Sequence, residues 1–186
     1  FYLSADGKLA KSESENTSTY ISDPNNPIPF IEGNHFHRMA PKHYNNDDQR
    51  FSSKRPDVLT FTSDVLTDEV KVSGKIKAMI DFATDQEDAD LYVKIIDVLP
   101  MDRVPHKTDV EGVKMNGYQK LVRLGYIRGR YRNSFEKAVP FTPNEVSGVN
   151  VPLLDVHHTF KPGHRIMIQI QSSMFPLFDI NPQNWV

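Results

Sequence analysis

Strict alternation of apolar and polar residues is the feature that most constrains the fold of this chain. In VKVSGKIKAMIDFAT, residues 70–84, apolar side chains stand at every second position. They are Ile76, Ala78, Ile80 and Phe82, and the residues between them are Lys75, Lys77, Met79 and Asp81. Successive side chains of a strand point to opposite faces of a sheet, so this spacing predicts a strand with one buried face. Helical spacing of apolar residues is nowhere sustained, and we expect helix to be minor.

Other segments carry strand signals of the same kind, separated by Pro and Gly turns. They are VLTFT (58–62), DLYVKIIDVLP (90–100), YQKLVRLGYIRGRYR (118–132), VSGVNVPLLDV (146–156) and HRIMIQIQ (164–171). The segment 90–100 is apolar on much of both faces, which predicts a central strand. Pro162 and Gly163 predict a type II turn in which the glycine takes a positive φ, and the isoleucines that follow share one face.

Long irregular stretches surround these strands. Residues 1–56 are rich in Ser, Asn, Pro and charge, and we expect extended chain there with little packed structure. Residues 101–119 predict a long loop. Six or more strands at irregular spacing favour an all-β fold, a two-sheet sandwich of jelly-roll type formed by residues 57–186. A chain of 186 residues fits a single domain, and we expect one domain over 1–186.

Composition excludes several classes of partner. The formal net charge is -2 and basic residues form no stripe, so we expect no nucleic acid partner. No apolar run approaches the ~18 residues that a membrane helix needs, and we expect no membrane partner. The chain has no cysteine, which excludes disulfides and thiolate metal sites. This leaves localisation open between the cytoplasm and a bacterial periplasmic or secreted location.

Glycine spacing excludes the common hydrolase and nucleotide motifs. A nucleophile elbow needs Gly-x-Ser-x-Gly, and the only glycines four apart, Gly125 and Gly129, have Ile127 between them. Gly112 and Gly117 have phosphate-loop spacing, but no Lys follows them. No His is followed by Glu, so the zinc-protease helix motif is absent. We therefore expect no catalytic triad and no cofactor within these 186 residues.

Some polar groups have the residue types of a ligand site. His35 and His37 would share a face of an extended segment, as two metal ligands do, but no third ligand stands nearby. We expect them in a loop, lining a pocket or solvated, and we expect no metal. NNDDQ, residues 45–49, lacks the spacing of a calcium loop, which favours a solvated turn. His157 and His158 precede a turn, and we interpret them as structural residues that cap backbone groups.

Three arginines alternate in RGRYR. On a strand, the guanidinium groups of Arg128, Arg130 and Arg132 would project to one side of the sheet. Like charges on one face need carboxylate partners or a bound ligand. We favour structural pairing, for example with Asp90 or Asp97, over ligand binding.

Six segments in the same order resemble one family. They are YLSADGKL, TYISDPNNPIPFIEG, DQR with RPDVLTFTSDVLTDEVKVSGKIKA, DADLYVKIIDVLP, RGRYRNS and HHTFKPGHRIMIQIQSSMFPLFDINP. Together they are similar to the C-terminal domain of the CocE/NonD hydrolases, which include X-Pro dipeptidyl-peptidases, cocaine esterase, alpha-amino-acid ester hydrolases and glutaryl-cephalosporin acylases. The resemblance implies a galactose-binding-like jelly roll packed on an upstream α/β-hydrolase domain. It places the Ser, Asp and His triad in that upstream domain, so no catalytic residue is carried onto this chain.

The resemblance implies one contribution to a site. In cocaine-esterase-like relatives, the segment after the Pro-rich strip, here EGNHFHRM, approaches the active-site mouth and supplies walls to the acyl pocket. On this chain the corresponding residues are His35, Phe36, His37 and Arg38. The imidazoles stand where those relatives carry aliphatic and aromatic side chains, and the loop to Asp48 is longer. The expected partners are the hydrolase domain and its small-molecule or peptide substrate: an X-Pro peptide, a β-lactam amide or an ester.

A stand-alone carbohydrate-binding jelly roll is the alternative from a different functional class. Such a module exposes aromatic rings near Asn, Asp or Arg, and Tyr44 beside NNDD is the best candidate. Both termini look cut, and we expect a piece of a longer protein with a bare edge strand or interdomain face. Such a surface predicts self-association into homo-oligomers at high concentration.

Overall fold

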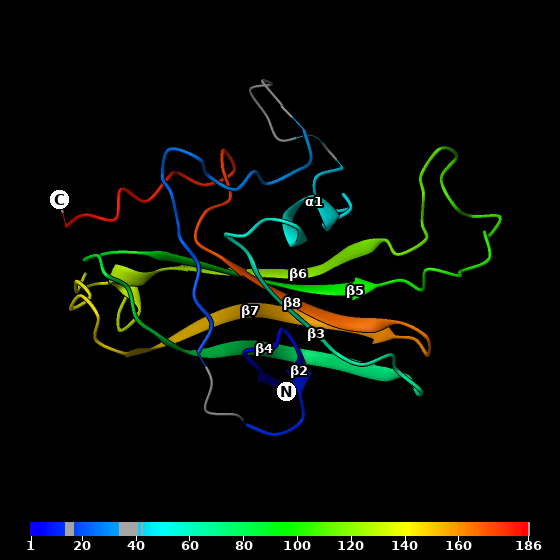
Figure 1. The fold of residues 1–186 in the computed structure, drawn as a ribbon, viewed down its shortest axis with the longest axis horizontal. Coiled ribbons are helices and arrows are strands. Elements are labelled where there is room, and N and C mark those ends of the chain that lie inside the picture. The colour runs from blue at the N-terminus through cyan, green and yellow to red at the C-terminus, as the bar shows by residue number, and fades with distance from the viewer. Residues whose placement is uncertain (14–16, 34–40, 42, 186) are drawn as a thin grey trace.

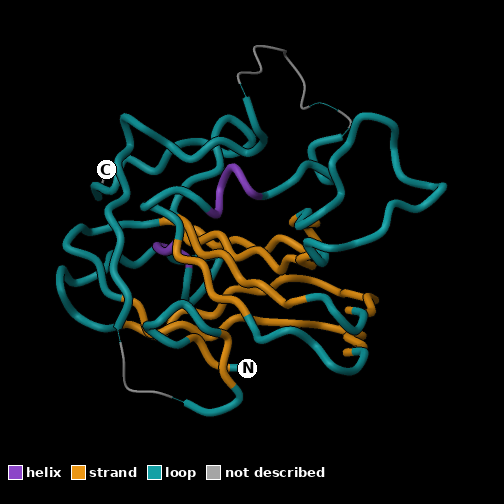
Figure 2. Tube along the Cα trace, turned by 45° about the vertical axis from the view of Figure 1, so that its right-hand side comes forward, coloured by secondary structure: helices purple, strands orange, loops and turns teal. Residues whose placement is uncertain are grey.

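The computed structural model describes residues 1–13, 17–33, 41 and 43–185. Its elements are β1 (Tyr2–Leu3), β2 (Leu9–Ala10), α1 (Arg50–Ser53), β3 (Leu59–Thr62), β4 (Val70–Phe82), β5 (Asp90–Val98), β6 (Gln119–Arg128), the 3-10 helix η1 (Gly129–Tyr131), β7 (Ser147–Phe160) and β8 (Arg165–Gln171). Strands and loops make up most of the molecule (Figure 2). Among the described residues, no helix is both long and apolar enough to cross a bilayer.

The larger sheet contains four antiparallel strands in the order β3, β8, β5, β6. β5 lies inside it, where Ile95 pairs with Ile168 of β8 on one side and with Arg123 of β6 on the other. All residues of β5 except the last are buried, since both faces of this sheet are covered. The expectation of a central strand that is apolar on both faces is confirmed.

The smaller sheet consists of β4 and β7, paired antiparallel from Val70 opposite Phe160 to Phe82 opposite Ser147. A register shift falls between Lys75 and Lys77. The predicted alternation of β4 is confirmed, with one face half-buried and the other exposed. Figure 1 shows this sheet as a second layer beneath the larger one. The main core lies between the layers and includes Leu91, Val93, Ile95, Val149, Val151, Leu153, Phe160, Ile166 and Ile170.

The face of the larger sheet turned away from β4 and β7 is called the outer face below. It carries Tyr92, Lys94 and Ile96 of β5, which alternate with the core residues of that strand. A second hydrophobic cluster covers part of it, formed by Phe30, Ile31, Tyr92 and Met174 with Tyr44, Leu124, Leu177 and Phe178. α1 lies on this side of the sheet, opposite β4 (Figure 1). The N-terminal strip and the C-terminal tail therefore act as a third layer.

Both outer edges of the smaller sheet lack a paired strand in the described part of the chain, since β7 also pairs with β4 alone. In the described part of the chain, β4 pairs with β7 alone, so its other edge presents unpaired backbone groups. A cleft of about 1470 Å³ opens between the two sheets and is lined in part by Val72, Ile76, Ile80 and Phe82 of β4. These side chains point inward and yet are only half-buried.

The observed fold confirms the expectation of an all-β protein built from antiparallel sheets. The assignment as a galactose-binding-like jelly roll stays a prediction, as does the single domain over 1–186. The first 56 residues contain only two strands of two residues each and the short α1 among those described, which agrees with an irregular segment. The turn before β8 has Gly163 at φ +82, as its Pro-Gly sequence predicts.

Candidate functional site

The loop residues predicted to line a pocket, His35, Phe36, His37 and Arg38, lie outside the described residues. The structure describes the chain on both sides of them, in residues 28–33 and 43–57. Both flanks lie with α1 on the side of the molecule away from β4 (Figure 1). The flanks and the surface beneath them therefore form the described part of the candidate site.

The first flank, residues 28–31, is fastened to the C-terminal tail. The Phe30 amide donates to the Phe175 carbonyl at 3.1 Å, and the Phe175 amide donates to the Ile28 carbonyl at 2.9 Å. Ile28 also donates its amide to the Ser173 hydroxyl at 2.8 Å. The Phe175–Pro176 peptide bond in this tail is cis. Ile28, Phe30 and Ile31 are buried, so the chain enters the loop from a fixed position.

The second flank, residues 43–57, is held by charge and by ring packing. The Arg50 guanidinium pairs with the Asp48 carboxylate, and Asp48 also accepts a hydrogen bond from the Gln119 amide of β6 at 3.1 Å. The Tyr44 ring packs on the Phe30 ring of the first flank, with centroids 6.0 Å apart. The two flanks therefore contact each other as well as the sheet. NNDDQ was predicted to be a solvated turn, but its last residue, Gln49, is fully buried.

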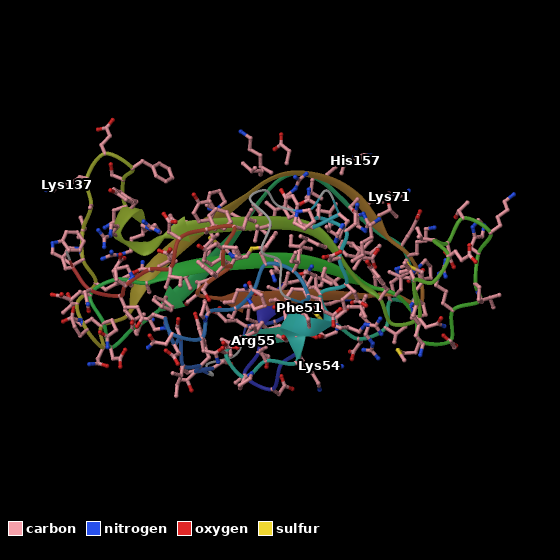
Figure 3. The ribbon with its side chains drawn as sticks, turned by 90° about the horizontal axis from the view of Figure 1, so that it is seen from above. Phe51, Lys54, Arg55, Lys71, Lys137 and His157 are labelled. Carbon is pink, nitrogen blue, oxygen red and sulfur yellow. The ribbon has the colours of Figure 1, made fainter. Side chains whose placement is uncertain are left out.

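A cavity of about 290 Å³ lies beside the flanks. It is lined by acidic and basic side chains and by one aromatic ring: Glu32, Asp48, Arg50, Lys54 and Phe51. Figure 3, seen from above, shows Phe51 on α1 with Lys54 and Arg55 just after it. At the C-terminal end of the second flank, the Arg55 guanidinium forms an ion pair with the Asp57 carboxylate at 2.6 Å. The mixed charges suit a small polar group or the surface of another domain better than an apolar ligand.

Beneath α1 lies a closed cluster of polar side chains. The Lys94 ammonium or amine nitrogen contacts Gln49 Oε1 at 3.0 Å and Ser52 Oγ at 3.3 Å. Ser52 in turn donates its hydroxyl proton to Gln171 Oε1 at 3.0 Å. All four residues have no exposed surface, and Gln169 beside them is fully buried as well. Burial lowers the pKa of Lys94 to about 7.

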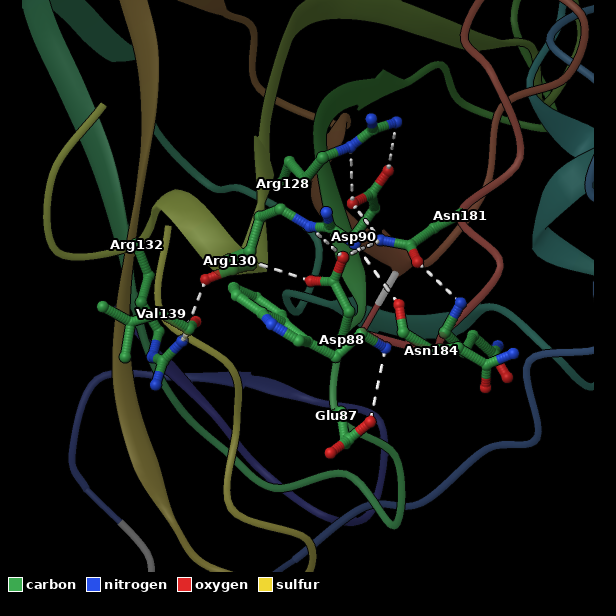
Figure 4. A network of polar contacts seen from close by, with 12 residues as sticks. Glu87, Asp88, Asp90, Arg128, Arg130, Arg132, Val139, Asn181 and Asn184 are labelled. Carbon is green, nitrogen blue, oxygen red and sulfur yellow. Dashed lines mark hydrogen bonds and ion pairs between the residues drawn. The ribbon is translucent and has the colours of Figure 1, made fainter. Parts of the chain in front are cut away.

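The arginines of RGRYR take part in a network at the far end of the sheet (Figure 4). Arg130 Nε lies 2.7 Å from Asp88 Oδ2, and Arg128 Nε lies 3.4 Å from Asp90 Oδ1. Asn181 of the tail donates to both carboxylates, at 3.0 Å and 2.7 Å. Burial raises the pKa of Asp90, against the lowering effect of Asn181 and Arg128. The prediction of structural pairing, with Asp90 as one partner, is confirmed.

The geometry expected for these arginines is wrong. β6 ends at Arg128, and the chain turns into η1 at Gly129, so the three side chains do not share a strand face. A Cβ at Gly129 would lie 2.4 Å from the Ala89 carbonyl oxygen, which is why the turn needs glycine. Arg132 donates its hydrogen bonds to the backbone carbonyls of Gly129, Val139 and Pro140. Its guanidinium lies over the Phe141 ring at 4.1 Å.

The second proposed arginine partner, Asp97, is engaged by two histidines. His158 Nε2 lies 2.9 Å from Asp97 Oδ2, and His164 Nδ1 lies 2.7 Å from Asp97 Oδ1. His158 was interpreted as a cap for backbone groups, whereas it lies within β7 and binds this carboxylate. His157 points to the exposed side near Ser73. Among the described residues, no group of three His, Asp or Glu side chains is arranged to hold a metal ion.

Sequence reasoning missed the Lys94 cluster. The available signal was a single lysine inside the apolar run DLYVKIIDV, where a charge on a central strand needs a specific explanation. Its partners Gln49 and Ser52 are 45 and 42 residues away in the chain, and Ser52 is 119 residues from its own partner Gln171, so spacing could not join them. The importance of Gln49 is visible only once α1 is placed on the outer face.

The described polar residues build structure: they fasten a strip, a tail and a short helix onto an all-β sandwich. This arrangement defines an all-β domain whose polar side chains hold its outer segments in place. The chain matches, over residues 2–185, the family described as the X-Pro dipeptidyl-peptidase C-terminal non-catalytic domain. It belongs to that family.

Similar proteins include enzymes much longer than this chain. Cocaine esterase of Rhodococcus sp. (strain MB1 Bresler) is 33% identical over 173 residues, which cover 91% of this chain and 27% of that protein. The solved structure of an aminopeptidase from a marine sediment Thaumarchaeota archaeon is 40% identical with a TM-score of 0.88, and covers 100% of this chain and 30% of that one. An alpha-amino acid ester hydrolase structure is 38% identical with a TM-score of 0.86 and the same coverage, 100% and 30%. The chain thus spans less than a third of the length of these relatives.

Proposed function

We propose that this chain is the non-catalytic C-terminal domain of a serine hydrolase that cleaves ester or amide bonds. In the parent protein it packs on an upstream α/β-hydrolase domain, whose Ser-His-Asp machinery performs the reaction. Family membership over residues 2–185 is the observation that carries the proposal. The relatives, an esterase, an aminopeptidase and an ester hydrolase, support this reaction class.

The substrate-pocket role of residues 33–49 is part of the same proposal. The first flank is largely buried, both flanks are held by hydrogen bonds, and the two are in ring contact with each other. Fixed flanks can present a loop to a neighbouring domain with little loss of conformational entropy, which is what a pocket wall requires. His35, Phe36 and His37 would supply the polar and aromatic surface of that wall, and Arg38 would add a positive charge.

The alternative, a carbohydrate-binding module, receives less support from the site. Its best candidate, Tyr44, packs against Phe30 and belongs to the second hydrophobic cluster. A stacking platform for a sugar needs an open ring face, and part of this ring is already covered. A glycan-array screen of the chain would favour this alternative if it showed reproducible binding.

A serine-directed covalent probe tests the proposed division of labour. The chain and its parent protein would each be treated with a fluorophosphonate and assayed on a chromogenic α-amino-acid ester. We expect the parent to turn over the ester and to lose activity on labelling, with the adduct mapped by mass spectrometry to a residue outside this chain. We expect the chain alone to be unlabelled and inactive. Stoichiometric labelling of a residue within the chain would contradict the proposal.

A further inference from the structure

Lys94 is the most unusual titratable group in the described structure. It stands on the central strand β5, has no exposed surface, and contacts only neutral oxygen acceptors, Gln49 Oε1 and Ser52 Oγ. Buried lysines are ordinarily paired with a carboxylate. Both acceptors here belong to the α1 segment, so this one side chain joins that segment to the sheet.

The orientation of the neighbouring groups matches an uncharged amine. Ser52 gives its hydroxyl proton to Gln171, and Gln49 gives a side-chain amide proton to the Asp47 carbonyl at 2.9 Å, so each presents an oxygen lone pair to Lys94. A neutral amine has two protons to donate, and both acceptors are then satisfied. The third proton of an ammonium group would meet no further acceptor among the contacts of Lys94. The Phe51 ring, 5.7 Å from the nitrogen, is near the limit at which a cation is stabilised by a ring face.

We propose that Lys94 holds α1 on the outer face as a neutral amine, and that protonation of this amine weakens the docking of α1. The proton comes from solvent when α1 opens, because the docked amine has no contact with water. The ammonium group formed in the open state regains hydration that the docked state cannot supply. Proton uptake and α1 release are therefore coupled.

No charged side chain named on the segments around Lys94 is available to neutralise an ammonium group there. Asp48, before α1, is engaged by Arg50 and by the Gln119 amide. Arg55, after α1, is engaged by Asp57. β8 contributes Gln169 and Gln171 at this place, and Gln169 Oε1 is buried with no hydrogen-bond partner. On β6 the nearby Lys120 is exposed, and on β5 Asp97 is bound by His158 and His164.

The direction of the pH dependence follows from the two protonation states. The pKa of Lys94 is lowered by burial to about 7, from 10.5 in an unhindered lysine. Between these values the open state binds the proton and the docked state does not, so docking strengthens as pH rises. The equilibrium constant for docking should increase roughly tenfold per pH unit in this window. Below pH 7 Lys94 is protonated in both the docked and the open state, so it no longer changes the equilibrium constant for docking.

Hydrogen exchange of the α1 amides tests the proposal on the 186-residue chain. The amides of Ser52, Ser53 and Arg55 donate to carbonyls within the α1 segment and report its opening. Protection factors, corrected for intrinsic rates, would be measured from pH 7 to 10 in the wild type, in Lys94→Met and in Lys71→Met. Lys71 is an exposed lysine on β4 and serves as the matched control. We expect protection to rise with pH in the wild type and Lys71→Met, and to stay flat in Lys94→Met.

A second measurement remains decisive if Lys94→Met does not fold. The ¹³Cε shift of Lys94 in the wild-type chain would be followed by NMR through the same pH range. A midpoint near 7 supports the proposal, whereas a midpoint near 10.5 or a flat protection profile would overturn it. Neither measurement depends on the proposed function.

Discussion

His158 of β7 and Asp97 of β5 join the two sheets directly, with Nε2 and Oδ2 2.9 Å apart. The second oxygen of the same carboxylate binds His164 of the turn before β8 at 2.7 Å. One buried carboxylate thus links β5 both to β7 and to the turn before β8.

Replacing Asp97 with Asn should lower the free energy of unfolding by about 2 kcal/mol. The amide cannot accept from both imidazoles at once, and hydrogen bonds to a charged group contribute about 1.5–3 kcal/mol each before compensation. Urea unfolding followed by circular dichroism would measure the change. Asp155→Asn is the control, since Asp155 is an exposed residue of β7. Equal stability of Asp97→Asn and the control would contradict a structural role for this carboxylate.

Replacing Arg130 with Met should destabilise the chain by about 3 kcal/mol, because it leaves the fully buried Asp88 without its cationic partner. The double variant Arg130→Met, Asp88→Asn should lose much less free energy of unfolding than the sum of the losses in the two single variants. A double-mutant cycle from chemical unfolding measures this coupling. Additive effects of the two substitutions would show that the ion pair at 2.7 Å does not stabilise the fold.

Ile168→Asp should unfold the chain, since Ile168 pairs with Ile95 on the inner side of the larger sheet and packs against the main core. An unpaired carboxylate at this partly buried position against the core would offset much of the roughly 5–15 kcal/mol of stability typical of a domain. Met79→Asp is the matched control, because Met79 is 71% exposed on β4. Recovery of soluble, folded Ile168→Asp protein at wild-type levels would rule out the placement of this strand.

The bare edge of β4 should cause reversible self-association. Unpaired backbone groups and the half-buried apolar side chains beside the cleft favour pairing with another strand. We expect the weight-average mass from light scattering to rise with concentration, and Ala78→Lys, which points a charge inward at this edge, to reduce the rise. A constant monomer mass up to millimolar concentration would contradict this expectation.

How much of the fold could be predicted depends on whether the signal was local. The alternation of residues 70–84 and the Pro-Gly turn before β8 are local patterns, and both expectations match the structure. The pairing of Arg128 with Asp90 could be anticipated because the charges needed partners. The end of β6 could not, because the close approach of Ala89 to Gly129 is a tertiary contact.

The candidate site shows the same division. The flanks of the loop were identified only through a family resemblance, and periodicity gave no sign of them. Gln49 was placed in a solvated turn because its neighbours are polar, whereas tertiary packing buries it against Lys94. A polar cluster assembled from three separate segments leaves no spacing pattern in the sequence.

The most direct test of the proposed role is the substrate preference of the parent enzyme carrying Phe36→Ala and His37→Ala. kcat/KM would be measured for two α-amino-acid esters that differ in acyl size, with the melting temperature as a check on folding. Phe135→Ala, at an aromatic residue that is 80% exposed in a distant loop, is the control. We expect the ratio of the two kcat/KM values to change by about tenfold with the melting temperature unaltered. An unchanged ratio with a lowered melting temperature would contradict a pocket-lining role.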